Sequence, residues 1–171
     1  MFARILCLII VALEARGLFL SIGDRRWKVF AFYTQLSNIA TAASAVLTLT
    51  LGETPFTILL RYLSSCMLVM TFFVTTCILI PMGGDPKRLL FSGNGFYHHL
   101  VIPIVSVGSY LLVEAHVRSA TAILLPTIVT LSYGMIMLVL NYKDVFDGPY
   151  PFFRVKNQSV GATVLWMSAL T

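Results

Sequence analysis

Charged residues are scarce in this chain of 171 residues: they make up 11% of it, whereas hydrophobic residues make up 58%. A soluble domain carries roughly 25% charged residues. So few charges cannot cover a water-facing surface, which excludes a soluble globular protein and predicts a chain that lies in lipid. The net charge of +5 does not indicate nucleic acid, because the basic residues sit in short loops and form no continuous stripe. The anionic face of a membrane is the expected partner.

Cysteine and metal-binding patterns are scarce as well. The three cysteines, Cys7, Cys66 and Cys77, lie inside apolar segments and form no Cys-x-x-Cys pair. They are predicted to pack as small hydrophobic side chains. His98 and His99 are adjacent, and neighbouring side chains on a helix point about 100° apart, which disfavours one shared metal ion. We therefore expect neither a metal nor a cofactor.

The sequence contains long apolar segments instead. A helix needs about 20 apolar residues to cross a bilayer, and five segments qualify. They run approximately over residues 2–22, 29–51, 56–82, 96–113 and 120–140. Glycine and proline are concentrated in the gaps between them. The fold class predicted from this pattern is all-α, a polytopic transmembrane helix bundle that forms a single domain over residues 1–171.

The two ends of the chain leave alternatives open. The tail from Val160 to Thr171 is apolar but too short to span a bilayer. We expect a short or truncated sixth helix there, and the alternative is a piece that lies in the interface. The alternative for the first segment is a cleaved signal peptide, with Arg4 as its basic region. Against this alternative, Glu14 and Arg16 are followed by further apolar residues. An uncleaved helix is therefore the favoured interpretation.

The distribution of Lys and Arg predicts how the chain crosses the membrane. Basic residues are concentrated in loops 24–28, 85–88 and 141–157, whereas the opposite side has only Arg4, Arg61 and Arg118. Cytoplasmic loops carry an excess of Lys and Arg. The three basic loops are therefore predicted to be cytoplasmic, in a multi-pass protein of the cell membrane with its N-terminus outside.

Thr34 and His98 are the leading candidates for catalytic residues. The second and fourth segments begin on the same predicted side, and each residue lies a few positions past the start of its segment. With a rise of about 1.5 Å per residue, both should lie within roughly 10 Å of the hydrocarbon boundary. A hydroxyl and an imidazole at one depth can act as nucleophile and base. Alternatively, Thr34 bonds its own helix carbonyl and His98 is an ordinary interfacial histidine.

The second segment has a polar and small face. Its members recur at helical spacing of three and four residues: Thr34, Ser37, Asn38, Thr41, Ser44, Ala45 and Thr48. From Thr41 to Thr48 this face is predicted to be a packing stripe, because small and hydroxylated residues let membrane helices approach closely. Asn38, one turn from Thr34, is a candidate oxyanion donor or orienting residue.

Charged residues within or beside the apolar segments are further candidates. Glu14 and Arg16 are costly inside the first segment, and residues two apart do not face each other on a helix. Each is expected to need a partner elsewhere, such as Asn38 or a headgroup, in a substrate-binding or structural role. His99 is a third polar candidate of this kind. Another set is predicted to form a solvated edge after the fourth segment: Glu114, His116 and Arg118.

Three short motifs resemble the androgen-induced, FAR-17a-like membrane protein family and its bacterial relatives. They are Trp27-Lys28-Val29-Phe30-Ala31-Phe32-Tyr33-Thr34, then His98-His99-Leu100-Val101-Ile102-Pro103, then Tyr150-Pro151-Phe152. The resemblance implies a multi-pass threonine hydrolase of fatty acid esters of hydroxy fatty acids. The family's nucleophile corresponds to Thr34. Its base is a histidine five residues before a proline, which corresponds to His98 rather than His99.

Three functions follow as hypotheses. The leading one is hydrolysis of a lipid ester by Thr34 and His98, with membrane lipids or fatty acyl esters as partners. A more distant family branch uses a cysteine and a histidine for phospholipid acyl transfer, and no cysteine lies near Thr34. The second is a transporter or binding bundle that uses Glu14, Arg16 and the polar face. The third is a structural membrane subunit. The sequence leaves the oligomeric state open.

Overall fold

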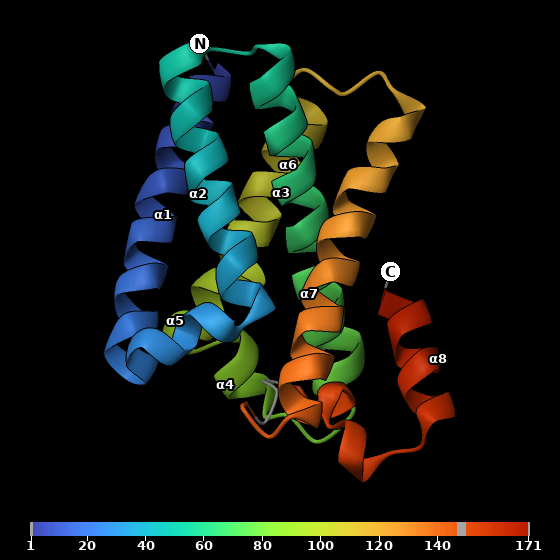
Figure 1. Ribbon diagram of the computed structural model, residues 1–171. Helices are drawn as coiled ribbons and strands as arrows, with labels where there is room; N and C mark the ends of the chain where they lie inside the picture. The colour runs from blue at the N-terminus through green and yellow to red at the C-terminus, as the bar shows by residue number, and fades with distance from the viewer. Residues whose placement is uncertain (1, 147–149, 171) are drawn as a thin grey trace. The chain divides into compact units, whose positions relative to one another are not determined.

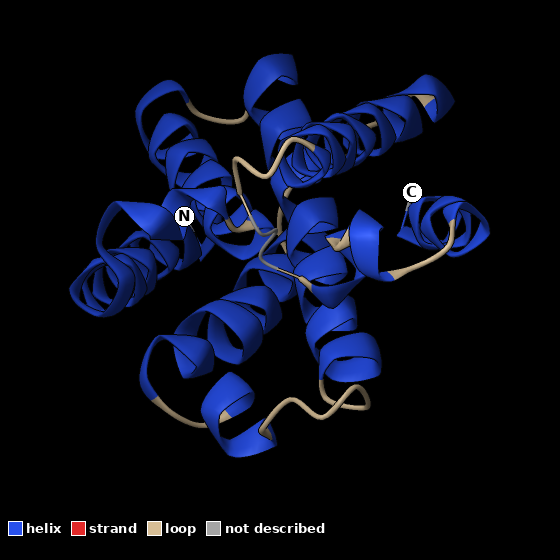
Figure 2. Cartoon of the chain, turned by 60° about the horizontal axis from the view of Figure 1, so that its bottom comes forward, coloured by secondary structure: helices blue, strands red, loops and turns tan. Residues whose placement is uncertain are grey.

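The computed structural model describes residues 2–146 and 150–170, and all regular structure in these residues is helical (Figure 2). This confirms the all-α fold class. The apolar pattern predicts a single domain over residues 1–171, and the chain divides into two compact units, Met1–Ser119 and Ala120–Thr171. Each unit is described by itself.

The first unit is built on four long helices (Figure 1). They are α1 (Phe2–Arg25), α2 (Tyr33–Leu51), α3 (Pro55–Phe73) and α6 (Ile102–Leu112). α1 packs against α2, α2 against α3, α3 against α6, and α6 against α1, so the four helices form a closed bundle. Its apolar centre includes the buried side chains of Cys7, Ile10 and Ala45.

Short helical pieces connect these helices. Between α1 and α2 the chain forms a 3-10 helix, η1 (Arg26–Ala31), and α3 continues as a π-helix, η2 (Val74–Leu79). The next pieces are α4 (Pro86–Leu90), α5 (Gly93–Gly95) and a second π-helix, η3 (Phe96–Val101), which leads into α6. The Asp85 side chain accepts a hydrogen bond from Lys87 N at 2.9 Å and so caps the start of α4.

Within the described residues, four helical segments are long and apolar enough to cross a membrane, and they fit a multi-pass membrane protein. They are Phe2–Gly23, Pro55–Leu79, Gly93–Leu112 and Ala120–Tyr142. These correspond to the first, third, fourth and fifth segments expected from the sequence. The expected second span is divided into η1 and α2, and α2 does not meet this criterion. Its polar residues lower its hydropathy, and the bundle accommodates them by burying them.

The polar face of α2 is a packing stripe, as predicted for Thr41 to Thr48. The hydroxyls of Thr41, Ser44 and Thr48 each donate to a carbonyl one turn earlier on α2, at 2.9 Å. The stripe also bonds to α3, with Ser37 Oγ 2.9 Å from Thr71 Oγ1 and Ser44 Oγ 3.1 Å from Ser64 Oγ. Lipid tails offer these hydroxyls no hydrogen-bond partner, so the bonds within α2 and to α3 satisfy them. The bonds to α3 also join the two helices.

A buried ion pair joins α3 to the chain after α6 and corrects the expectation of a solvated edge for Glu114. Arg61 Nε and Nη2 donate to the two oxygens of Glu114, both at 2.8 Å, and Ser109 Oγ donates to Glu114 Oε1 at 2.6 Å. Arg61 also reaches Ser106 Oγ on α6 at 3.1 Å. Arg61 is only 1% exposed, whereas His116 and Arg118 are exposed as predicted. No sequence pattern pairs Arg61 with Glu114, because 53 residues separate them.

The second unit consists of helices and a compact aromatic loop. Its elements are η4 (Ala120–Ile123), α7 (Leu124–Tyr142), η5 (Pro151–Phe153), η6 (Val155–Asn157) and α8 (Val160–Leu170). α8 is the short apolar helix expected from the tail. Phe153 packs against Tyr133 of α7 with ring centroids 5.9 Å apart, and Phe152 against Trp166 of α8 at 5.5 Å. Phe152 of the motif Tyr150-Pro151-Phe152 thereby anchors the loop to α8, and the next residue, Phe153, anchors it to α7.

Candidate functional site

Thr34 is the second residue of α2 and is partly exposed. Its carbonyl accepts hydrogen bonds from Ser37 Oγ at 2.8 Å and from Asn38 Nδ2 at 2.6 Å, which hold the first turn of α2 in place. The N-terminus of a helix carries a partial positive charge that stabilises nearby anions. The Thr34 hydroxyl therefore lies where an alkoxide or an oxyanion is favoured electrostatically.

His99 faces the Thr34 hydroxyl. His99 Nε2 lies 3.3 Å from Thr34 Oγ1, and His99 Nδ1 lies 2.8 Å from the carbonyl oxygen of Leu89 in α4. A carbonyl only accepts hydrogen bonds, so Nδ1 must carry the proton. In the neutral imidazole, Nε2 is then the acceptor and is directed at the threonine hydroxyl. The Leu89 carbonyl thus selects the tautomer that a general base needs.

His98, the histidine that the sequence favours as the base, contacts α1 rather than Thr34. His98 is only 1% exposed and points toward α1, where its Nδ1 lies 3.3 Å from Ser21 Oγ. Both histidines belong to the π-helix η3. Adjacent side chains on such a helix point in different directions, and its irregular register cannot be inferred from spacing to Pro103. The result is that His99 contacts Thr34 and His98 contacts α1.

Glu14 faces the interior of the bundle and Arg16 faces outward. Glu14 is 3% exposed, and its Oε2 lies 3.9 Å from His98 Nε2. Its Oε1 has no hydrogen-bond partner among the described residues. Arg16 is exposed, with its guanidinium 6.0 Å from the centre of the Phe19 ring. The partner of Glu14 is therefore His98 rather than Asn38.

Asn38 is placed to orient Thr34 rather than to bind an oxyanion. Its side chain is fully buried, and its Nδ2 donates to the Thr34 carbonyl. A buried amide that already bonds the backbone is not presented to a substrate oxygen. Of the two roles expected for Asn38, the geometry fits the orienting one.

Several residues that sequence reasoning missed hold the two histidines. Asn94 Nδ2 donates to Ser21 Oγ at 3.1 Å, so Ser21 links Asn94 to His98. Gly95 is buried, and a Cβ added to it would lie 2.6 Å from the Leu89 carbonyl oxygen. Only glycine lets α5 approach α4 this closely. The two glycines just before the histidines, Gly93 and Gly95, were the available sequence signal, but such a pair is typical of an ordinary loop.

The arrangement brings together groups that are used in nucleophilic catalysis. A hydroxyl, a neutral imidazole and a group that orients the imidazole form the basic constellation of nucleophilic catalysis. Among the described residues, no cluster of three or more His, Cys, Asp or Glu could hold a metal ion. Comparison of the chain with protein-family models, curated proteins and solved structures gives no match. The family resemblance of the three motifs therefore stays a prediction.

Proposed function

We propose that this chain is an intramembrane, threonine-dependent hydrolase of lipid esters, with Thr34 as nucleophile and His99 as base. The observation that carries the proposal is the line from the Leu89 carbonyl through His99 to the Thr34 hydroxyl. Thr34 and His99 are also partly exposed, whereas His98 is closed off. Reactive groups must be accessible to substrate, so the exposure of His99 and its tautomer both favour His99 as the base.

The proposed reaction has two steps. Thr34 Oγ1 attacks the ester carbonyl while its proton passes to His99 Nε2, and His99 then gives that proton to the alcohol as the ester C–O bond breaks. The acyl group is left on Thr34. A water molecule then attacks it, His99 takes the water proton and returns it to Thr34, and the free acid leaves. The positive end of α2 lies beside the oxyanion formed in each step.

A lipid substrate is favoured by the surroundings of the pair. Leu36, two residues after Thr34, and Phe96, three residues before His99, are exposed large hydrophobic side chains. An acyl chain that arrives from the bilayer would lie against such side chains. A water-soluble ester would gain nothing from them.

The decisive test is covalent labelling of Thr34. We expect a fluorophosphonate probe to label the purified chain, and we expect Thr34→Ala to abolish labelling and hydrolysis of a long-chain fatty ester. Thr50→Ala is the matched control, because Thr50 is an exposed threonine at the other end of α2 that bonds only its own helix. Equal labelling of Thr34→Ala and Thr50→Ala would overturn the assignment of the nucleophile.

Gly95→Ala is expected to reduce Thr34 labelling about 10- to 100-fold, because the added methyl group displaces the Leu89 carbonyl that orients His99. Gly108→Ala is the control, since a Cβ at Gly108 meets nothing within 4 Å. The measurement is the labelling rate at equal amounts of folded protein. Equal rates in the two variants would show that the Leu89 carbonyl does not position the base.

The buried Glu14 supports a second candidate function, proton-coupled transport. A carboxyl group inside a membrane helix is expensive and marks a functional site by default. Glu14 has His98 as its titratable neighbour at 3.9 Å. Proton-coupled uptake that is lost in Glu14→Gln, in a chain without esterase activity, would favour this function. Uptake that is insensitive to Glu14→Gln would exclude it.

A further inference from the structure

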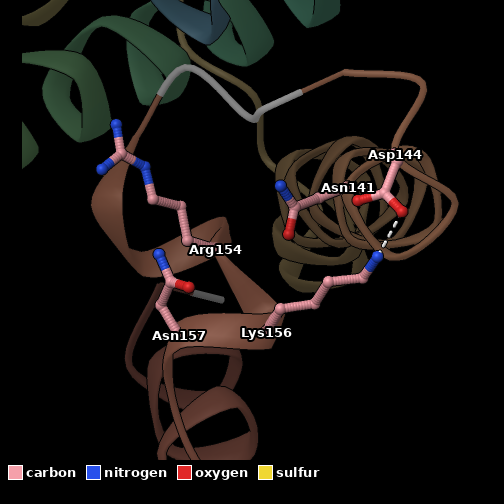
Figure 3. A pocket seen from close by; sticks show the side chains of 5 residues that line it. All are labelled: Asn141, Asp144, Arg154, Lys156 and Asn157. Atoms are coloured by element: carbon pink, nitrogen blue, oxygen red, sulfur yellow. Dashed lines mark hydrogen bonds and ion pairs between the residues drawn. The ribbon is translucent and has the colours of Figure 1, made fainter.

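A polar hollow lies in the second unit, where α7 ends and the aromatic loop begins. It has a volume of about 370 Å³ and is lined by Asn141, Asp144, Arg154, Lys156 and Asn157. Figure 3 shows Asn141 and Asp144 on the α7 side, and the other three on the segment before α8. This volume is at the lower end of the range of ligand sites. It fits a small polar group.

The walls of the hollow are fixed by hydrogen bonds. Asn141 is buried, and its Oδ1 accepts from Val155 N at 2.9 Å, so the last turn of α7 holds the basic segment directly. Asn157 N donates to the Arg154 carbonyl at 3.0 Å, and Gln158 Nε2 donates to the Phe152 carbonyl at 2.9 Å. The side chains of Arg154 and Lys156 therefore project from a backbone that these hydrogen bonds hold in place.

The charges in the hollow favour an anion. Lys156 Nζ forms an ion pair with Asp144. The Arg154 guanidinium makes no hydrogen bond or ion pair with any residue that the structure describes, and in Figure 3 it extends away from the Lys156–Asp144 pair. Two cations and one carboxylate leave a net charge of +1. Guanidinium and amide donors around a small space are the groups that bind phosphate oxygens.

The surroundings of the hollow favour a lipid as the source of that phosphate. The hollow lies at the end of a helix that is long and apolar enough to cross a membrane. The ends of a membrane-spanning helix lie at the depth of the lipid headgroups. Tyr142 and Val145 beside it are 71% and 68% exposed, and Val160 at the start of α8 is 82% exposed. An exposed tyrosine at this depth is typical of the membrane interface. A free phosphate would make no use of these apolar side chains.

We propose that this hollow binds the phosphate of a phospholipid headgroup, with Arg154 as the principal donor and Lys156 and Asn157 as further donors. The acyl chains would lie against the exposed apolar residues of α7 and α8. This site shares no residue with the Thr34 site and does not depend on the esterase proposal.

The test is a lipid titration of the full chain in neutral detergent, with bound lipid counted by native mass spectrometry. Phosphatidic acid is expected to bind at one saturable site, and diacylglycerol, which lacks the phosphate, is not. Arg154→Gln is expected to weaken phosphatidic acid binding about ten-fold. Lys143→Gln removes the same charge from an exposed residue that does not line the hollow, and it should leave binding unchanged.

A variant that is expected to bind phosphatidic acid more tightly distinguishes loss of the site from loss of folding. Asp144 adopts a left-handed conformation with φ 55°, which asparagine also tolerates. Asp144→Asn removes the competing carboxylate and frees Lys156, so phosphatidic acid should bind about two- to five-fold more tightly. Unchanged binding in both Arg154→Gln and Asp144→Asn would overturn the proposal. Displacement of phosphatidic acid by millimolar inorganic phosphate would assign the site to a soluble phosphate and overturn the lipid assignment.

Discussion

Arg61→Ala is expected to lower the free energy of unfolding by about 3–5 kcal/mol, because it leaves the Glu114 carboxylate buried without its cation. The pair is bidentate, with both N···O distances at 2.8 Å, and Arg61 is 1% exposed. Arg61 also bonds Ser106 on α6 at 3.1 Å, so its loss removes a link between α3 and α6. Glu114→Ala should cost a similar amount, since it leaves the guanidinium uncompensated.

Unfolding by sodium dodecyl sulfate in mixed micelles, followed by circular dichroism, measures this loss. Arg118→Ala is the control, because Arg118 is an exposed arginine and its removal should change the stability by less than about 0.5 kcal/mol. The double variant Arg61→Met with Glu114→Leu removes both charges and should recover most of the stability. A single variant as stable as Arg118→Ala would show that the ion pair does not stabilise the bundle.

The helices and the polar stripe of α2 could be predicted from the sequence because both depend on local pattern. Apolar segments of sufficient length define the spans. The rise per residue put Thr34 and His98 at one level, and it is the neighbouring His99 whose Nε2 lies 3.3 Å from Thr34 Oγ1. The stripe from Thr41 to Thr48 was also predictable, since helical spacing alone puts these residues on one face.

The contact between His99 and Thr34 and the pairing of Arg61 with Glu114 could not be predicted, because both depend on the tertiary structure. A π-helix at Phe96–Val101 changes the direction of each side chain, and nothing in the spacing to Pro103 reports it. Leu89 orients His99 through a backbone carbonyl, which no side-chain motif encodes. Arg61 and Glu114 meet only because α3 packs beside α6. Buried polar pairs that are distant in sequence are where pattern reasoning fails in this protein.

His99→Gln is expected to reduce esterase turnover and Thr34 labelling by about 10²- to 10⁴-fold, because glutamine cannot accept the threonine proton. The apo distance of 3.3 Å between His99 Nε2 and Thr34 Oγ1 is long for a strong hydrogen bond. Such distances commonly shorten when substrate binds. Glutamine can still bond the Leu89 carbonyl, so the fold around η3 should be preserved. The loss should therefore fall on kcat rather than on KM.

His98→Gln separates this assignment from the one that the family resemblance implies. His98 is buried against α1, where it contacts Ser21 and Glu14. Its replacement should lower the unfolding temperature, because the buried imidazole ring and its packing contacts are lost. The folded fraction should nevertheless label at the rate of the unchanged chain. The opposite result, in which His98→Gln stops labelling of folded protein and His99→Gln does not, would make His98 the base. The π-helical register would then have to change when substrate binds, since only such a shift could bring His98 to Thr34.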